Sequence, residues 1–225
     1  MPWQVNHSEI VQQAYQNAEF LYQRASQIVR AHPQEDPEGL GHILNNWAVL
    51  KGQTGRFAEA ISLYEEALQF WQLSYRQPNP NMALVMNNLA GAYLEQQNYD
   101  QAEILYQQSG TIWRTLGLQA HSYFGNNRDG LAILYVATGR QSPALETLEQ
   151  AIEVDDQYIK HIFASGSESQ RMKFLQIASG RYARFLTLLS QHLSNSPKLT
   201  QKAFELVLRR KGISTEALAM QRQLV

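Results

Sequence analysis

Two pairs of adjacent asparagines, Asn45 with Asn46 and Asn87 with Asn88, offer the most specific binding chemistry in this chain of 225 residues. The two pairs stand 42 positions apart. An asparagine amide both donates and accepts hydrogen bonds, so it can pair with a peptide backbone whatever side chains that peptide carries. A ladder of such amides predicts a surface that holds an extended peptide or a protein partner.

Six further side chains are expected on the same helical faces as the asparagines, at steps of three or four residues. They mix imidazole, amide, carboxylate and aliphatic groups, which would form pockets that set specificity beside the amides. The alternative is that some of the asparagines cap turns or bridge adjacent helices. The six candidates are His42 and Gln53 in a first segment, Leu84 and Glu95 in a second, and Asn126 and Asp129 in a third.

The sequence lacks the residue patterns that are typical of catalytic and metal-binding sites. The chain has no cysteine, which excludes disulfides, cysteine-ligated metals and thiol nucleophiles within these residues. Its six histidines form neither a pair at helical ligand spacing nor a cluster with carboxylates, and no Ser-His-Asp set follows from the spacing. With 19 basic and 20 acidic residues, the chain lacks the charge excess that attracts nucleic acids or anionic lipids. We expect no enzyme, no cofactor, no metal, and neither nucleic acid nor membrane as a partner.

An internal repeat predicts the elements that position these side chains. The phrases AEFLYQRA, AISLYEEA, AEILYQQS and ALETLEQA begin at Ala18, Ala60, Ala102 and Ala144, always 42 residues apart. Apolar residues three or four apart in each phrase indicate a helix. Each phrase is expected to be the second helix of a repeat, and the segments upstream, which include Asn45 and Asn87 and keep the same spacing, predict the first helix.

Turn-forming residues separate the expected helices. Gly55 and Gly139 lie in short turns within repeats, and Ser142 with Pro143 suits the N-cap and first turn of a helix. Trp71 and Trp113 are also 42 residues apart. They could anchor a partner, but packing between repeats is the interpretation that we favour.

With alanine, tyrosine and alanine at these spacings, the repeats resemble tetratricopeptide repeats, and Asn87 to Tyr93 resembles the kinesin-light-chain subtype. The resemblance covers roughly residues 39 to 157. It implies an all-α fold, a right-handed α-solenoid of antiparallel helix pairs with additional C-terminal helices. It also implies that Asn46 and Asn88 hold a ligand backbone in the concave groove, whereas Gly130 stands at the matching position of the third repeat.

The predicted organisation has three parts. Residues 1–38 form an incomplete repeat that contains only a second helix, residues 39–157 form three repeats, and residues 158–225 form a helical extension or connector. Ser167 and Gln170 suit a capping box at the start of a helix in that extension. One apolar stripe is expected there, made of Met172, Leu175, Tyr182, Phe185, Leu186 and Leu189.

Two C-terminal phrases, 165–171 and 207–219, resemble the connector of bacterial CHAT proteins, which carry a caspase-like protease domain after their repeats. The resemblance implies a recognition arm with a covalently linked protease-like domain as a further partner, and the incomplete first repeat indicates a fragment excised from a larger protein. A cytoplasmic location is expected on separate grounds, because the N-terminus lacks a basic segment followed by an apolar one and no apolar run is long enough to span a bilayer. Protease activity is not carried over, since the chain has no cysteine. The alternative function is a structural or self-assembly module that docks an attached domain or another copy through apolar ends.

Overall fold

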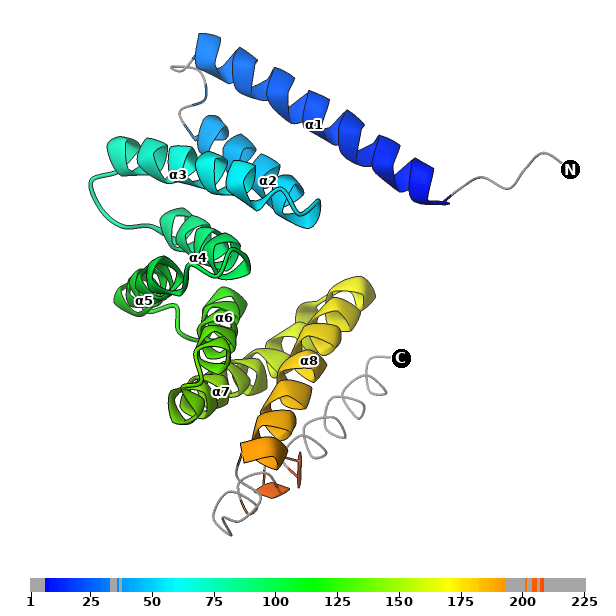
Figure 1. Ribbon diagram of the computed structural model, residues 1–225, viewed down its shortest axis with the longest axis vertical. Helices are drawn as coiled ribbons and strands as arrows, with labels where there is room; N and C mark the ends of the chain where they lie inside the picture. The colour runs from blue at the N-terminus through cyan, green and yellow to red at the C-terminus, as the bar shows by residue number, and fades with distance from the viewer. Residues whose placement is uncertain are drawn as a thin grey trace, which may run out of the picture. The chain divides into compact units, whose positions relative to one another are not determined.

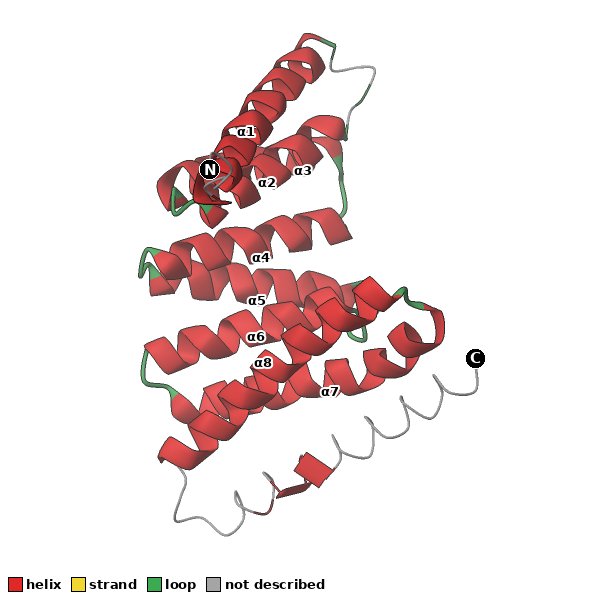
Figure 2. Ribbon diagram, turned by 90° about the vertical axis from the view of Figure 1, so that its right-hand side faces the viewer, coloured by secondary structure: helices red, strands yellow, loops and turns green. Residues whose placement is uncertain are grey.

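The computed structural model of the chain describes residues 7–32, 36, 38–192 and, further on, 201, 204, 205, 207 and 208. Its regular elements are eight helices and, among these residues, no strands (Figures 1 and 2), which confirms the predicted all-α class. The helices are α1 (His7–Ala31), α2 (Gly39–Gln53), α3 (Phe57–Ser74), α4 (Pro80–Glu95), α5 (Tyr99–Thr115), α6 (Ser122–Ala137), α7 (Gln141–Ser165) and α8 (Glu168–His192).

The chain divides into two compact units, an N-terminal half, Met1–Ile112, and a C-terminal half, Trp113–Val225. In the N-terminal half, α1 packs on α2, α2 on α3 and α3 on α4. In the C-terminal half, α7 packs against both α6 and α8. Consecutive helices thus form antiparallel pairs in each half. None of the helices in the described part of the chain is long and apolar enough to cross a membrane.

Small residues at the repeat positions allow the helices to approach closely. A methyl side chain fills little space, so two helix backbones can come together where it lies. Ser109, which replaces alanine in the third phrase, is fully buried and donates its hydroxyl to the Ala83 carbonyl at 2.7 Å. The burial of the alanines confirms the repeat in the second to fourth phrases and their upstream helices, where Ala48, Ala60, Ala67, Ala90, Ala102, Ala132, Ala144 and Ala151 are at most 2% exposed. In the first phrase Ala18 and Ala25 are only half-buried.

The turns within repeats share one geometry. Gly55, Gln97 and Gly139 all have a positive φ, of 74°, 59° and 72°. The residue after each of them donates its backbone N–H to a carbonyl five residues earlier, as Arg140 does to Tyr135 at 2.7 Å. This is the Schellman arrangement that ends helices, and glycine adopts its left-handed conformation without strain. The predicted tight turns are confirmed.

The start of α7 differs from the prediction. Arg140 is the N-cap residue and its side chain makes no capping hydrogen bond, so the expected N-cap at Ser142 is wrong. The reason is that α7 begins immediately after the Schellman turn, so the last residue of the turn, Arg140, takes the N-cap position. The Arg140 carbonyl accepts the first helical hydrogen bond, from the Ala144 N–H at 3.1 Å.

The C-terminal helices combine confirmed and wrong predictions. The capping box is present: the Ser167 N–H donates to Gln170 Oε1 at 2.8 Å, and the Gln170 N–H donates to Ser167 Oγ at 3.3 Å. α7 continues to Ser165, past the boundary expected at residue 157. The predicted stripe is wrong at Met172 and Leu186, which are exposed. It is confirmed at Tyr182, Phe185 and Leu189, which pack on α7 together with Phe174, Ala178 and Leu188.

Two glycines of α2 provide a matched test of this packing. A Cβ at Gly41 would lie 2.5 Å from the Trp71 indole, whereas a Cβ at Gly52 would meet nothing within 4 Å. Gly41→Ala should lower the free energy of unfolding by about 1 to 3 kcal/mol through overpacking. Gly52→Ala should raise it by about 0.5 to 1 kcal/mol, since alanine loses less backbone entropy than glycine. Urea unfolding followed by circular dichroism measures both, and equal effects of the two substitutions would contradict this packing.

Candidate peptide-binding surface

The asparagines of α2 and α4 form a chain of side-chain hydrogen bonds. Asn88 Nδ2 donates to Asn45 Oδ1 at 3.1 Å, and Asn45 Nδ2 donates to Asn46 Oδ1 at 3.2 Å. Asn45 is 6% exposed, Asn88 is half-buried and Asn46 is exposed. The amides therefore bridge adjacent helices, the alternative that the sequence left open, and Asn45 is placed to orient the other two.

Two hydrogen-bonding groups of this chain remain unused. Among the described residues, Asn46 Nδ2 has no acceptor and Asn88 Oδ1 has no donor. A peptide group presents one carbonyl and one N–H, which are the complements of these two groups. The arrangement can hold a backbone segment without selecting its side chains.

The other candidates in the N-terminal half lie around this chain of amides. Asn87 and Leu84, on α4, are half-buried. His42 is exposed, and its ring meets the Trp71 indole edge-on, with centroids 5.2 Å apart. Gln53 and Glu95 are the last residues of α2 and α4 and are both exposed. Trp71 itself is only 1% exposed, so it packs in the core, as favoured from the sequence.

A cluster of ion pairs connects α1 to α2 and α3. It was not predicted from the sequence. The Lys51 side chain, 4% exposed, forms ion pairs with Glu19 of α1 and, at 2.6 Å, with Glu59 of α3. Arg56 reaches Glu19 as well, at 2.6 Å. The hydrogen bonds from Arg56 and Lys51 lower the pKa of the Glu19 carboxyl. The position of Lys51 on a mostly apolar helix face was the feature of the sequence that could have indicated this buried ion pair.

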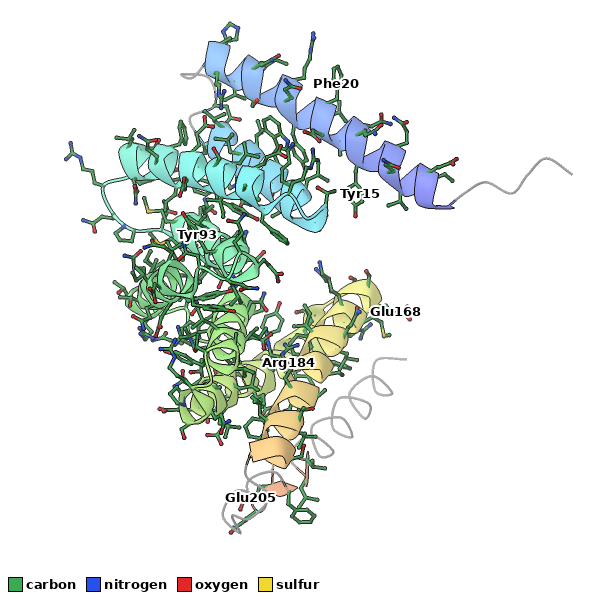
Figure 3. The ribbon with its side chains drawn as sticks, viewed as in Figure 1. Tyr15, Phe20, Tyr93, Glu168, Arg184 and Glu205 are labelled. Carbon is green, nitrogen blue, oxygen red and sulfur yellow. The ribbon has the colours of Figure 1, made fainter. Side chains whose placement is uncertain are left out.

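In the C-terminal half, the two candidates of α6 are bonded to α8. Arg184, labelled in Figure 3, binds Asp129 through both oxygens, at 2.5 and 3.2 Å. Arg181, 1% exposed, donates to Asn126 and to Asp155 of α7. Sequence reasoning missed both arginines, because nothing in the local spacing relates α8 to α6. Asn126 and Asp129 thus have partners within the chain.

The described residues hold no group of three or more histidine, cysteine, aspartate or glutamate side chains that could bind a metal ion.

The orienting role of Asn45 can be tested by stability. Asn45→Ala should lower the free energy of unfolding by about 1 to 3 kcal/mol, because it leaves the half-buried Asn88 amide without its acceptor. Asn46→Ala, at an exposed position, should change it by no more than about 0.5 kcal/mol. Thermal and urea unfolding of both variants give these values. Equal losses would show that Asn45 has no special role.

Comparisons with known proteins agree with the geometry. Residues 39–115 match the tetratricopeptide repeat family. The structure of BtubC (BKLC) from P. vanneervenii is 20% identical, with a TM-score of 0.55 over 94% of this chain and 92% of that one. The Signal Transduction ATPase with Numerous Domains (STAND) protein with a tetratricopeptide repeat sensor from Pyrococcus horikoshii is 16% identical, with a TM-score of 0.54 over 80% of this chain and 29% of that one.

Kinesin light chain TPR-like repeats from Podosopora anserina are 19% identical, with a TM-score of 0.48 over 83% of this chain and 95% of that one. No curated protein matches the sequence. At identities of 20% and 16%, the two matches with TM-scores of 0.55 and 0.54 establish the fold and nothing finer. Residues 39–115 are similar to tetratricopeptide repeats, and the helix pairs of this chain have the all-α fold of tetratricopeptide solenoids.

Proposed function

We propose that the chain is a non-catalytic tetratricopeptide scaffold that binds an extended peptide or protein partner along α2 and α4. The observation that carries the proposal is the pair of unused groups at Asn46 and Asn88, one donor and one acceptor held by Asn45. Because the hydrogen bonds to Asn45 already fix these amides, binding would cost little further ordering of side chains.

Specificity would come from the side chains around the amides. The His42 ring offers a flat surface and Leu84 an aliphatic one. Gln53 and Glu95, at the ends of their helices, offer hydrogen bonds to polar side chains of a ligand. Such a mixture favours a peptide with both apolar and polar residues. Backbone hydrogen bonds would supply affinity, and these neighbours would select the sequence.

We also propose that the chain serves as the cytoplasmic recognition or regulatory arm of a larger CHAT-type protein. Support comes from the resemblance of residues 165–171 to a CHAT connector. This phrase forms the capped start of α8, through Ser167 and Gln170. The other phrase, 207–219, lies almost wholly outside the described residues. In this proposal the linked protease-like domain responds to the peptide bound by the repeats.

The double substitution Asn46→Ala, Asn88→Ala tests the binding proposal. Peptides selected on the chain from a random 12-residue display library should lose about 5- to 150-fold in affinity, the equivalent of two hydrogen bonds. Isothermal titration calorimetry measures the loss. The matched control is Gln69→Ala, Gln72→Ala, which removes two exposed amides of α3 and should leave affinity unchanged. Unchanged affinity in the asparagine variant would contradict the proposal.

A second candidate function, self-assembly, is favoured by the outer face of α1. Ile10, Phe20, Leu21 and Ile28 are 52% to 65% exposed, which is high for large apolar side chains. Figure 3 shows Phe20 and Tyr15 on opposite sides of α1. A second copy, or an attached domain, could cover this face.

Light scattering over a concentration series separates the two candidates. Self-assembly through α1 predicts dimers or larger species that dissociate in the variant Phe20→Ser, Leu21→Ser, since this change removes apolar area from the contact. Peptide affinity should not change in this variant. A chain that stays monomeric up to about millimolar concentration, the weak end of protein association, would exclude the second candidate.

A further inference from the structure

The C-terminal half contains a groove between α6 and α8, with α7 as its floor. α8 reaches α6 through the long side chains of Arg181 and Arg184, which bind Asn126 and Asp129. These contacts, which we name the arginine bridge, span the groove. A cavity lies on each side of it, of about 310 Å³ toward the end of α6 and about 470 Å³ toward its start.

The smaller cavity, the apolar compartment, suits an aliphatic side chain. Ala132, Ile133 and Val136 of α6 form one wall, Leu148 of α7 the floor and Leu188 of α8 the other wall. Ile133 and Val136 are 38% and 43% exposed, whereas Leu148 is 1% exposed. A ligand side chain that reached Leu148 would therefore cover apolar surface that water now contacts, which stabilises the complex.

The larger cavity, the donor compartment, is lined by hydrogen-bond donors. Ser122, Asn126, Gln170 and Lys173 line it, and their side-chain donors, Ser122 Oγ, Asn126 Nδ2, Gln170 Nε2 and Lys173 Nζ, make no hydrogen bond within the described part of the chain. Tyr123 and Phe174 add aromatic walls. Four unused donors, one of them cationic, favour an anionic acceptor such as a carboxylate.

The charged residues around the donor compartment also favour a carboxylate ligand. Asp155, the carboxylate among its lining residues, is 2% exposed and forms an ion pair with the buried Arg181. Arg181 also holds the Asn126 oxygen, which leaves the Asn126 NH₂ group for a ligand. Gly125 gives the guanidinium its room, because a Cβ there would lie 3.1 Å from Arg181 Nη1. The positive charge of Lys173 therefore remains without a counterion among the described side chains.

The distance between the two compartments determines how many residues must separate the two side chains of a peptide that enter them. Along α6 the donor compartment spans 121–126 and the apolar compartment 132–136, so their centres are about ten residues apart. At 1.5 Å per helical residue this is roughly 15 Å. An extended peptide covers that distance in about four or five residues.

We propose that this groove binds an acidic segment of a partner protein in extended form. The carboxylate of an Asp or Glu side chain enters the donor compartment, and an aliphatic side chain four or five residues away enters the apolar compartment. The backbone crosses over the arginine bridge between them. The inference deepens the proposed peptide-binding function, but it uses residues of α6, α7 and α8 rather than the asparagines of α2 and α4.

Fluorescein-labelled peptides with a Gly-Ser host sequence, one Leu and one Glu test the groove by fluorescence polarisation. The Leu and Glu are separated by two to eight positions, and affinity should be highest at four or five. Lys173→Gln should weaken the best peptide about two- to fivefold, the effect of one exposed ion pair. The same peptide with Gln in place of Glu should bind more weakly and should not respond to Lys173→Gln.

Matched controls exclude general charge and stability effects. Gln176→Glu changes the net charge of α8 by the same amount as Lys173→Gln, at an exposed position that lines neither compartment, and should leave affinity unchanged. Ile133→Ser should weaken binding, whereas Leu186→Ser, at an equally exposed position outside the groove, should not. Equal effects within either pair of variants would overturn the proposal, as would the absence of binding at about 1 mM for every spacing.

The Asn46→Ala, Asn88→Ala variant separates this proposal from the proposed function. Groove binding predicts that the best Leu-Glu peptide responds to Lys173→Gln and keeps its affinity in the asparagine variant. A peptide that loses affinity only in the asparagine variant would overturn the groove proposal and support binding along α2 and α4.

Discussion

Close approach of helices at small, repeated side chains is the constraint on which the rest of this structure depends. Alanine at fixed places in each repeat lets one helix lie directly against the next, and larger side chains there would force the backbones apart. Ser109 shows how strict the position is, since the one polar replacement is small and gives its hydroxyl to a backbone carbonyl. This packing fixes which face of each first helix remains available for binding.

The two halves of the chain use their first helices in different ways. In the N-terminal half, short amide side chains join α4 to α2, so the helices lie close and present asparagines. In the C-terminal half, long arginine side chains join α8 to α6, and the space beside them remains open as two cavities. Helices bridged by short amide side chains present a surface that offers single hydrogen bonds. Helices bridged by long arginine side chains leave cavities that can accept whole side chains of a ligand.

Local features of the structure followed well from the sequence. The repeat predicted the helix pairs, the glycines predicted their turns, and Ser167 with Gln170 predicted the start of α8. The prediction at Ser142 failed because a turn with its own hydrogen bonds replaces a side-chain cap. The predicted stripe on α8 failed at Met172 and Leu186 because α7 lies beside a neighbouring face of that helix.

The sequence by itself determined the helices, their repeat and the residue types available for binding, because these depend on spacing along a single helix and on nearby turns. Only the tertiary structure decided which side chains are used within the chain and which remain for a partner. Asn45 bonds to a residue 43 positions away, and Asn126 to one 55 positions away. Such pairs depend on how the helices pack, and no spacing within one helix encodes them.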